Sequence, residues 1–80
     1  MRTVVRKGVR PMPDACCAII DRLIEERRHR QMTQKQLADA AGLTQSVIAS
    51  LETKKATPQL DTLLRVAAAL GCTLAVVPHS

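Results

Sequence analysis

The side chains that could do chemistry in this chain are amides, hydroxyls and lysines gathered between residues 34 and 55. An amide can bond to adenine N6 and N7 together, a hydroxyl to a base edge or a phosphate, and an ammonium group to phosphates. No nucleophile–base pair, metal-ligand set or phosphate-binding loop accompanies them. The expected chemistry is therefore binding to a polyanion, with no enzyme activity, metal or cofactor. The candidate residues are Gln34, Lys35, Thr44, Gln45, Ser46, Ser50, Lys54 and Lys55.

Four helices are predicted to position these side chains. Apolar residues recur at three- and four-residue steps, and Asp14 is expected as the N-cap of the first helix. Thr33 and Gln36 form a capping box before the second helix, which Gly42 ends, and Thr44 caps the third. The predicted helices span about 14–30, 33–41, 45–52 and 59–70. The fourth is expected to turn Leu60, Leu63, Leu64, Ala67, Ala68 and Leu70 toward the core.

The second and third predicted helices meet the conditions of a helix-turn-helix. Two steeply crossing helices need a small residue at the crossing, which Ala38 supplies, and a positive φ in the turn, which Gly42 supplies. All these conditions are met in one register, which favours this motif over an ordinary helical hairpin. The positions that must be apolar to hold the angle are Leu37, Ala41, Leu43, Ile48 and Leu51.

Residues 32–71 resemble the lambda-repressor-like, XRE-type helix-turn-helix family. The resemblance implies a mainly α fold of four to five helices, with the third helix in the major groove of DNA. It also implies a structural ion pair between Arg27 and Glu52. The sequence departs from the family pattern at two places. Gln31 stands where the family often has Gly, and Thr53-Lys54 stands where the family commonly has Asn-Gly. The matching residues are Arg27, Thr33-Gln34, Leu37-Ala38, Ala41-Gly42-Leu43-Thr44, Ile48, Leu51-Glu52, Pro58, Leu63, Ala67 and Leu70-Gly71.

In this register each candidate side chain has an expected role. Gln45 is the first candidate base reader, since its amide can bond bidentately to adenine. Ser46 and Ser50 share its face and would contact bases, phosphates or bridging waters. Gln34 resembles the family's Gln at the start of the second helix, which lies against a phosphate, and could also buttress Gln45. Thr44 would add a phosphate contact to its cap. The other expected phosphate contacts are Lys35, Lys54 and Lys55, for which simple solvation is the alternative.

The segment after the fourth helix is rich in β-branched residues and too short for a helix, which predicts a strand. An unpaired apolar edge favours a partner strand. The segment is similar to the HipB-type antitoxin branch, where the strand pairs with its twin across a dimer. Such pairing would separate two recognition helices by about 34 Å, one turn of DNA. Alternatively, the strand could pair with residues 3–5 of the same chain or fold back on its own domain. The expected interface residues are Thr73, Leu74, Ala75, Val76 and Val77.

Composition limits the partners. Twelve Lys and Arg against seven Asp and Glu give a net charge of +5, and no Phe, Tyr or Trp is present to stack on single-stranded bases. We expect a basic arm at 1–12, a helix-turn-helix domain at 13–71 and a strand or tail at 72–80. Three cysteines with no zinc spacing are expected as free thiols in a reducing cytoplasm. Nothing resembles a signal peptide or a membrane span.

The sequence thus predicts a homodimeric repressor that binds a palindromic double-stranded operator. The rival interpretation is an antitoxin that neutralises a protein toxin and regulates its own operon. A phage-type repressor or excision-control protein would bind DNA in a similar way. A core without aromatic residues favours a chain that gains stability from a second copy.

Overall fold

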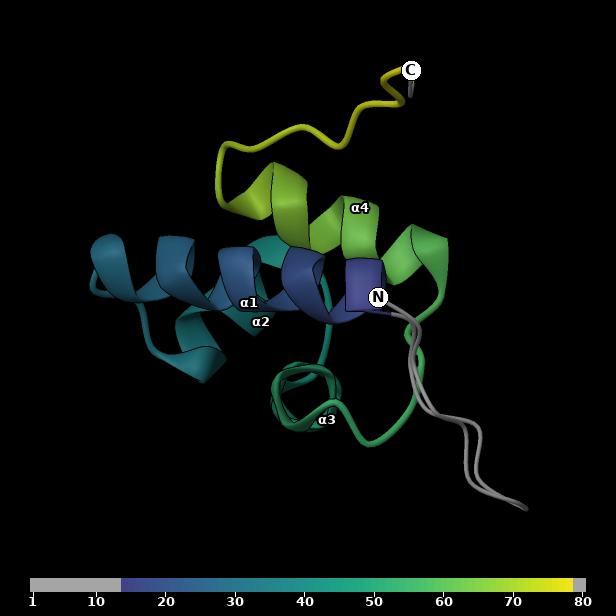
Figure 1. The fold of residues 1–80 in the computed structure, drawn as a ribbon. Coiled ribbons are helices and arrows are strands. Elements are labelled where there is room, and N and C mark those ends of the chain that lie inside the picture. Colours follow the sequence, from purple (N-terminus) through teal and green to yellow (C-terminus); the bar gives the residue numbers. More distant parts are fainter. Residues whose placement is uncertain (1–13, 79–80) are drawn as a thin grey trace.

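The computed structural model describes residues 14–78, which form four helices joined by short loops (Figure 1). The helices are α1 (Asp14–His29), α2 (Gln34–Ala41), α3 (Gln45–Thr53) and α4 (Leu60–Ala69). Asp14 is the first residue of α1, whereas the sequence predicted it as the N-cap. The predicted basic arm, with Arg2, Arg6, Lys7 and Arg10, lies outside the described residues. None of the described helices is both long and apolar enough to cross a membrane.

The predicted caps of α2 and α3 are confirmed. The Thr33 hydroxyl accepts from the Gln36 amide at 3.0 Å, and the Gln36 side chain accepts from the Thr33 amide at 2.8 Å. Gly42 ends α2 with φ at 70°, in the left-handed region that glycine enters at least cost. The Thr44 hydroxyl accepts from the Val47 amide at 3.2 Å and so caps α3. The turn between the two helices is therefore fixed by local bonds.

The core gathers residues from all four helices, but α4 lies in a different rotation from the predicted one. Leu60 and Leu64 are 66% and 45% exposed, and Ala68 is also exposed, so these three expectations are wrong. Val66, which was not predicted, is fully buried. The buried face of α4 centres on 63, 66, 67 and 70, about 100° around the helix from the 60–64–68 stripe. The core cluster is Ile20, Leu23, Leu37, Ala38, Ile48, Leu51, Leu63, Val66, Ala67 and Leu70.

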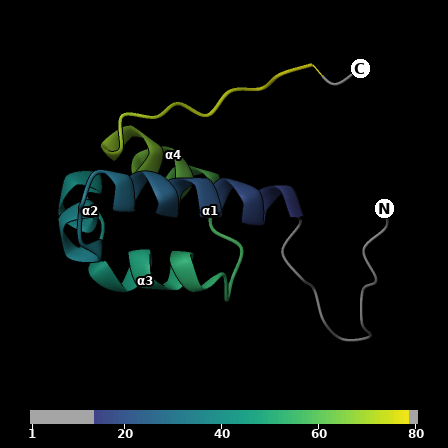
Figure 2. The same ribbon diagram turned by 60° about the vertical axis from the view of Figure 1, so that its left-hand side comes forward.

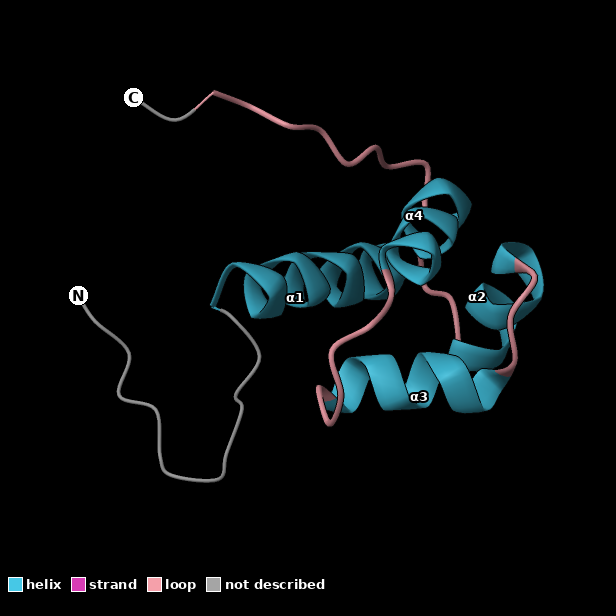
Figure 3. Cartoon of the chain, turned by 90° about the vertical axis from the view of Figure 1, so that its right-hand side faces the viewer, coloured by secondary structure: helices cyan, strands magenta, loops and turns pink. Residues whose placement is uncertain are grey.

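The helices are arranged so that α3 remains open on one side. It packs on α2 and α1, while α4 packs on α2. Figures 2 and 3 show α3 on one side of the domain and residues 72–78 on the opposite side, with α1 and α4 between them. The predicted recognition helix and the predicted dimer segment therefore occupy opposite sides.

The C-terminal segment is extended (Figure 1), and residues 14–78 of this single chain contain no strand, so the strand predicted to pair across a dimer is not confirmed. Cys72 and Leu74 pack against the core, whereas Val76 and Val77 are exposed. A strand is defined by bonds to a neighbouring strand, and the described part of this one chain offers none. Pairing with a second copy remains a prediction, and residues 3–5 lie outside the described region.

Two residues other than glycine adopt positive φ within the described chain. They are Gln31, at 55°, and Lys54, at 59°. These are the positions where the family often carries glycine, so the loops keep the left-handed turn despite the substitution. At each of these two residues the left-handed backbone conformation costs about 1–2 kcal/mol, because the residue has a Cβ atom.

Candidate nucleic-acid interface

The exposed face of α3 is polar and small but carries no charge. Ile48 and Leu51 fix its rotation because they are 0% and 4% exposed. By helical spacing, the outward side chains fall in two rows on the opposite face. One row is Gln45, Ala49 and Thr53, and the other is Ser46 and Ser50. Sequence reasoning found three of these five but missed Ala49 and Thr53, although their four-residue steps from Gln45 indicate the same face.

An ion pair fastens α3 to α1. Arg27 Nε donates to Glu52 Oε2 at 2.7 Å and its Nη2 donates to Glu52 Oε1 at 3.0 Å. Arg27 Nη1 also donates to the Met32 carbonyl at 2.7 Å. The two charged side chains are only 13% and 11% exposed. The structural role that the family resemblance implied for this pair is confirmed, and each guanidinium nitrogen of Arg27 already donates a hydrogen bond within the protein.

Gln34 belongs to the same network. Its Nε2 donates to Glu52 Oε1 at 3.2 Å, so the amide at the start of α2 holds the carboxylate near the end of α3. Among the described residues, no hydrogen bond joins Gln34 to Gln45. The amide nitrogen carries two hydrogens, and its second one remains available for a phosphate. Gln34 therefore supports Glu52, whereas the sequence suggested that it would support Gln45.

The three candidate lysines have different surroundings. Lys35 lies 4.0 Å from Asp39 on the exposed surface of α2. Lys54 is paired with Asp21 of α1, and the hydrogen bond with that carboxylate raises the pKa of Lys54 above its ordinary value of 10.5. Lys55 is exposed and makes no hydrogen bond or ion pair with any described residue. Lys55 is thus the most accessible of the three for a phosphate.

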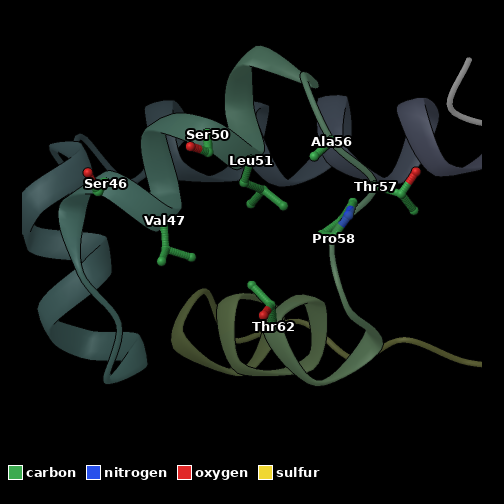
Figure 4. A pocket seen from close by; sticks show the side chains of 8 residues that line it. All are labelled: Ser46, Val47, Ser50, Leu51, Ala56, Thr57, Pro58 and Thr62. Atoms are coloured by element: carbon green, nitrogen blue, oxygen red, sulfur yellow. The ribbon is translucent and has the colours of Figure 1, made fainter.

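A shallow hollow of about 250 Å³ separates α3 from the start of α4 (Figure 4). Val47, which is 36% exposed, points into it from α3, and Thr62 points into it from α4. Ser46 and Ser50 stand at its edge. Helix α3 is therefore closely packed against α1 and α2 but loosely packed against α4. The lining residues are Ser46, Val47, Ser50, Leu51, Ala56, Thr57, Pro58 and Thr62.

The described cysteines Cys16, Cys17 and Cys72 are free and half-buried, as the sequence predicted. Cys16 and Cys72 pack against the core as small apolar groups.

Comparison with known proteins agrees with this geometry. A helix-turn-helix family model matches residues 23–77. The chain is similar to an uncharacterised helix-turn-helix transcriptional regulator of Haemophilus influenzae, with 44% identity over 61 residues, which cover 76% of this chain and 62% of that protein. It is 41% identical to the immunity repressor of Bacillus phage phi105 over 51 residues, covering 64% of this chain and 35% of the repressor.

Two relatives come from toxin–antitoxin systems. Antitoxin HigA1 of Mycobacterium tuberculosis is 32% identical over 71 residues, which cover 89% of this chain and 48% of the antitoxin. A solved toxin–antitoxin module from Streptococcus pneumoniae is 51% identical with a TM-score of 0.71, covering 84% of this chain and 74% of that one. The chain spans less than two thirds of the length of the curated relatives. On the matched residues and the fold together, the chain belongs to the XRE-type helix-turn-helix family.

Proposed function

We propose that this protein is a sequence-specific, double-stranded DNA-binding regulator that represses transcription by occupying its operator in the cytoplasm. The observation that carries this proposal is the exposed, uncharged polar face of α3, supported from behind by the Arg27–Glu52 network. Such a face can read bases, because amide and hydroxyl side chains form hydrogen bonds with the base edges exposed in the major groove.

Recognition then divides between the two helices of the motif. Gln45 binds an adenine through N6 and N7, while Ser46 and Ser50 contact neighbouring bases or waters. The N-terminus of α2 presents free backbone N–H groups and the second amide hydrogen of Gln34 to a phosphate. At the N-terminus of α3, Thr44 makes a phosphate contact in addition to its capping bond. These contacts fix the register in which Gln45 reads its base.

The cations supply affinity that does not depend on sequence. Lys35 and Lys55 are exposed and bind phosphates directly. Lys54 must exchange Asp21 for a phosphate, or bind both, so its contribution is smaller than that of Lys55. The basic residues expected at 1–12 would add further phosphate contacts.

We also propose that the operator is palindromic and the protein a homodimer joined through Thr73, Leu74, Ala75, Val76 and Val77. Val76 is fully exposed and Val77 is 75% exposed, which is unfavourable for apolar side chains unless a partner covers them. Because this segment lies on the side opposite α3, pairing of two tails leaves both recognition helices uncovered. Half-sites about 34 Å apart, one turn of DNA, are expected.

The test is selection of bound sequences from a random duplex pool. Enrichment of an inverted repeat supports the proposal, and no enrichment refutes it. On the selected operator, Gln45→Ala should reduce discrimination at one base pair by about 1–3 kcal/mol per half-site. Gln59→Ala is the matched control, because Gln59 makes no side-chain capping bond and lies outside α3. Lys55→Ala should weaken binding to all sequences and reduce the salt slope by about one unit, which Lys55→Arg should not do.

A second candidate function is supported by the similarity to HigA1 and to the Streptococcus pneumoniae module. In this function the protein neutralises a protein toxin and represses the operon that encodes both. Co-expression with the product of the adjacent gene discriminates between the two. If this protein rescues growth on co-expression and co-purifies with the adjacent gene product, the antitoxin function is supported. If it binds its operator but shows neither effect, it is a repressor without a toxin partner.

A further inference from the structure

The row formed by Gln45, Ala49 and Thr53 ends in methyl groups. Ala49 presents only its β-methyl, and it is half-buried on the outer side of α3. Thr53 carries a hydroxyl, but its Oγ1 donates to the Ser50 carbonyl at 2.9 Å. Because that bond turns the hydroxyl back to the helix backbone, the γ-methyl is the group that exposed Thr53 offers to a ligand. One turn beyond the amide of Gln45, this row is therefore apolar, while the neighbouring row carries the hydroxyls of Ser46 and Ser50.

An apolar patch on a base-reading helix has one natural counterpart in the major groove. Thymine is the base that presents an apolar group there, its 5-methyl, and alanine and threonine methyl groups are suited to contact it. The hydroxyls of Ser46 and Ser50 lie in the other row and read donors or acceptors only loosely. The methyl groups of Ala49 and Thr53 are therefore the candidates for discrimination in this part of the half-site.

We propose that the methyl groups of Ala49 and Thr53 read the 5-methyl group of one thymine in each half-site. The proposal rests on the DNA-binding function proposed above and assigns part of its specificity. Four residues of α-helix advance about 6 Å, and base pairs are about 3.4 Å apart. The thymine is thus expected about two base pairs from the adenine that Gln45 binds.

Small side chains along both rows favour this contact. No long or charged side chain in these positions would keep α3 away from the base edges in the major groove. The residues are Ser46, Ala49, Ser50 and Thr53. The Arg27–Glu52 pair keeps the helix rotation fixed, so Ala49 cannot turn away from the bases without breaking two hydrogen bonds.

The experiment is a uracil scan of the selected operator with the full chain. Uracil has the same hydrogen-bonding groups as thymine but lacks the 5-methyl group, so each replacement removes one methyl contact. The wild-type protein should lose about 4-fold in affinity per half-site at one thymine, which corresponds to the ~0.8 kcal/mol of one buried methylene. That thymine should lie about two base pairs from the position at which Gln45→Ala loses discrimination.

Two variants assign the effect to the named residues. Ala49→Gly should reduce the thymine-to-uracil affinity ratio at that position to about one, and Thr53→Ser, which keeps the hydroxyl, should lower it partly. Ala68→Gly is the matched control, since Ala68 is an exposed helical alanine on α4, and it should keep the full ratio. The ratio is measured within each variant, so a loss of folded protein cancels.

The outcomes separate this inference from the proposed function. If selection enriches no operator, both proposals fall. If an operator is bound but no thymine is sensitive to uracil, only the methyl contact is refuted. A sensitive thymine whose ratio is unchanged in both Ala49→Gly and Thr53→Ser also refutes it, because another residue must then contact the methyl group.

Discussion

Replacing Arg27 by alanine tests the structural basis of the recognition face. The substitution removes two hydrogen bonds to Glu52 and one to the Met32 carbonyl, and it leaves a nearly buried carboxylate without its cation. Loss of one partner from a buried pair costs about 3–5 kcal/mol. A domain of 80 residues has a total stability of about 4–12 kcal/mol. Arg27→Ala should therefore remove about a quarter or more of the unfolding free energy.

The assay is urea unfolding followed by circular dichroism at 222 nm, because the chain has no Trp or Tyr for fluorescence. Arg22→Ala is the matched control. Its side chain is 74% exposed and its Nη2 lies 3.8 Å from Glu26 Oε1, so the loss should stay below about 1 kcal/mol. The double variant Arg27→Met, Glu52→Leu should recover most of the stability, because apolar side chains can replace a buried ion pair.

The reasoning is refuted if Arg27→Ala and Arg22→Ala destabilise the protein equally. It is also refuted if the double variant is no more stable than Arg27→Ala, since the cost would then not come from the unpaired carboxylate. Either result would mean that α3 is held in place by Ile48 and Leu51 alone.

Three further predictions follow from the backbone, the surface pair and the register of α4. Gln31→Gly should raise the unfolding free energy by about 0.5–1 kcal/mol, because φ is already 55° there, and Gln31→Val should lower it, both in the same urea assay. The pKa of Lys54 is raised by its bond to Asp21, so the pair stabilises the fold fully below pH 10.5 and loses this effect as the pH rises through the folded pKa. The stability difference between wild type and Asp21→Asn should therefore shrink in alkaline solution, and a constant difference would contradict this account. Leu63→Ala should cost about 2–5 kcal/mol and Leu64→Ala under about 1 kcal/mol in thermal unfolding, and similar losses would mean that α4 is rotated as the sequence first suggested.

Features governed by bonds within a few residues could be predicted from the sequence. The Thr33–Gln36 capping box, the left-handed Gly42 and the Thr44 cap each join a side chain or amide to a partner at most four residues away. The outward position of Gln45 follows in the same way, because the apolar period fixes the rotation of α3.

What could not be predicted depends on contacts between distant parts of the chain. Leu60, Leu63 and Leu64 look alike in sequence, and the core face of α4 is decided by where α2 and α3 lie. The bond from Gln34 to Glu52 spans 18 positions, and no local pattern announces it. Ala49 has no polar group that would mark it as a candidate in the sequence, and the bond from Thr53 Oγ1 to the Ser50 carbonyl becomes visible only in the folded helix.

For the proposed DNA-binding function, the hollow between α3 and α4 (Figure 4) offers a way to change the sequence preference without changing the residues proposed to contact bases. A side chain in place of Thr62 that is too large for the hollow would press on Val47 and displace α3 together with Gln45, Ser46 and Ser50. Hydrogen bonds weaken steeply with such displacements, so a different operator can become preferred while Gln45, Ser46 and Ser50 stay the same. Divergence of operator choice within this family can thus arise at positions that never touch DNA.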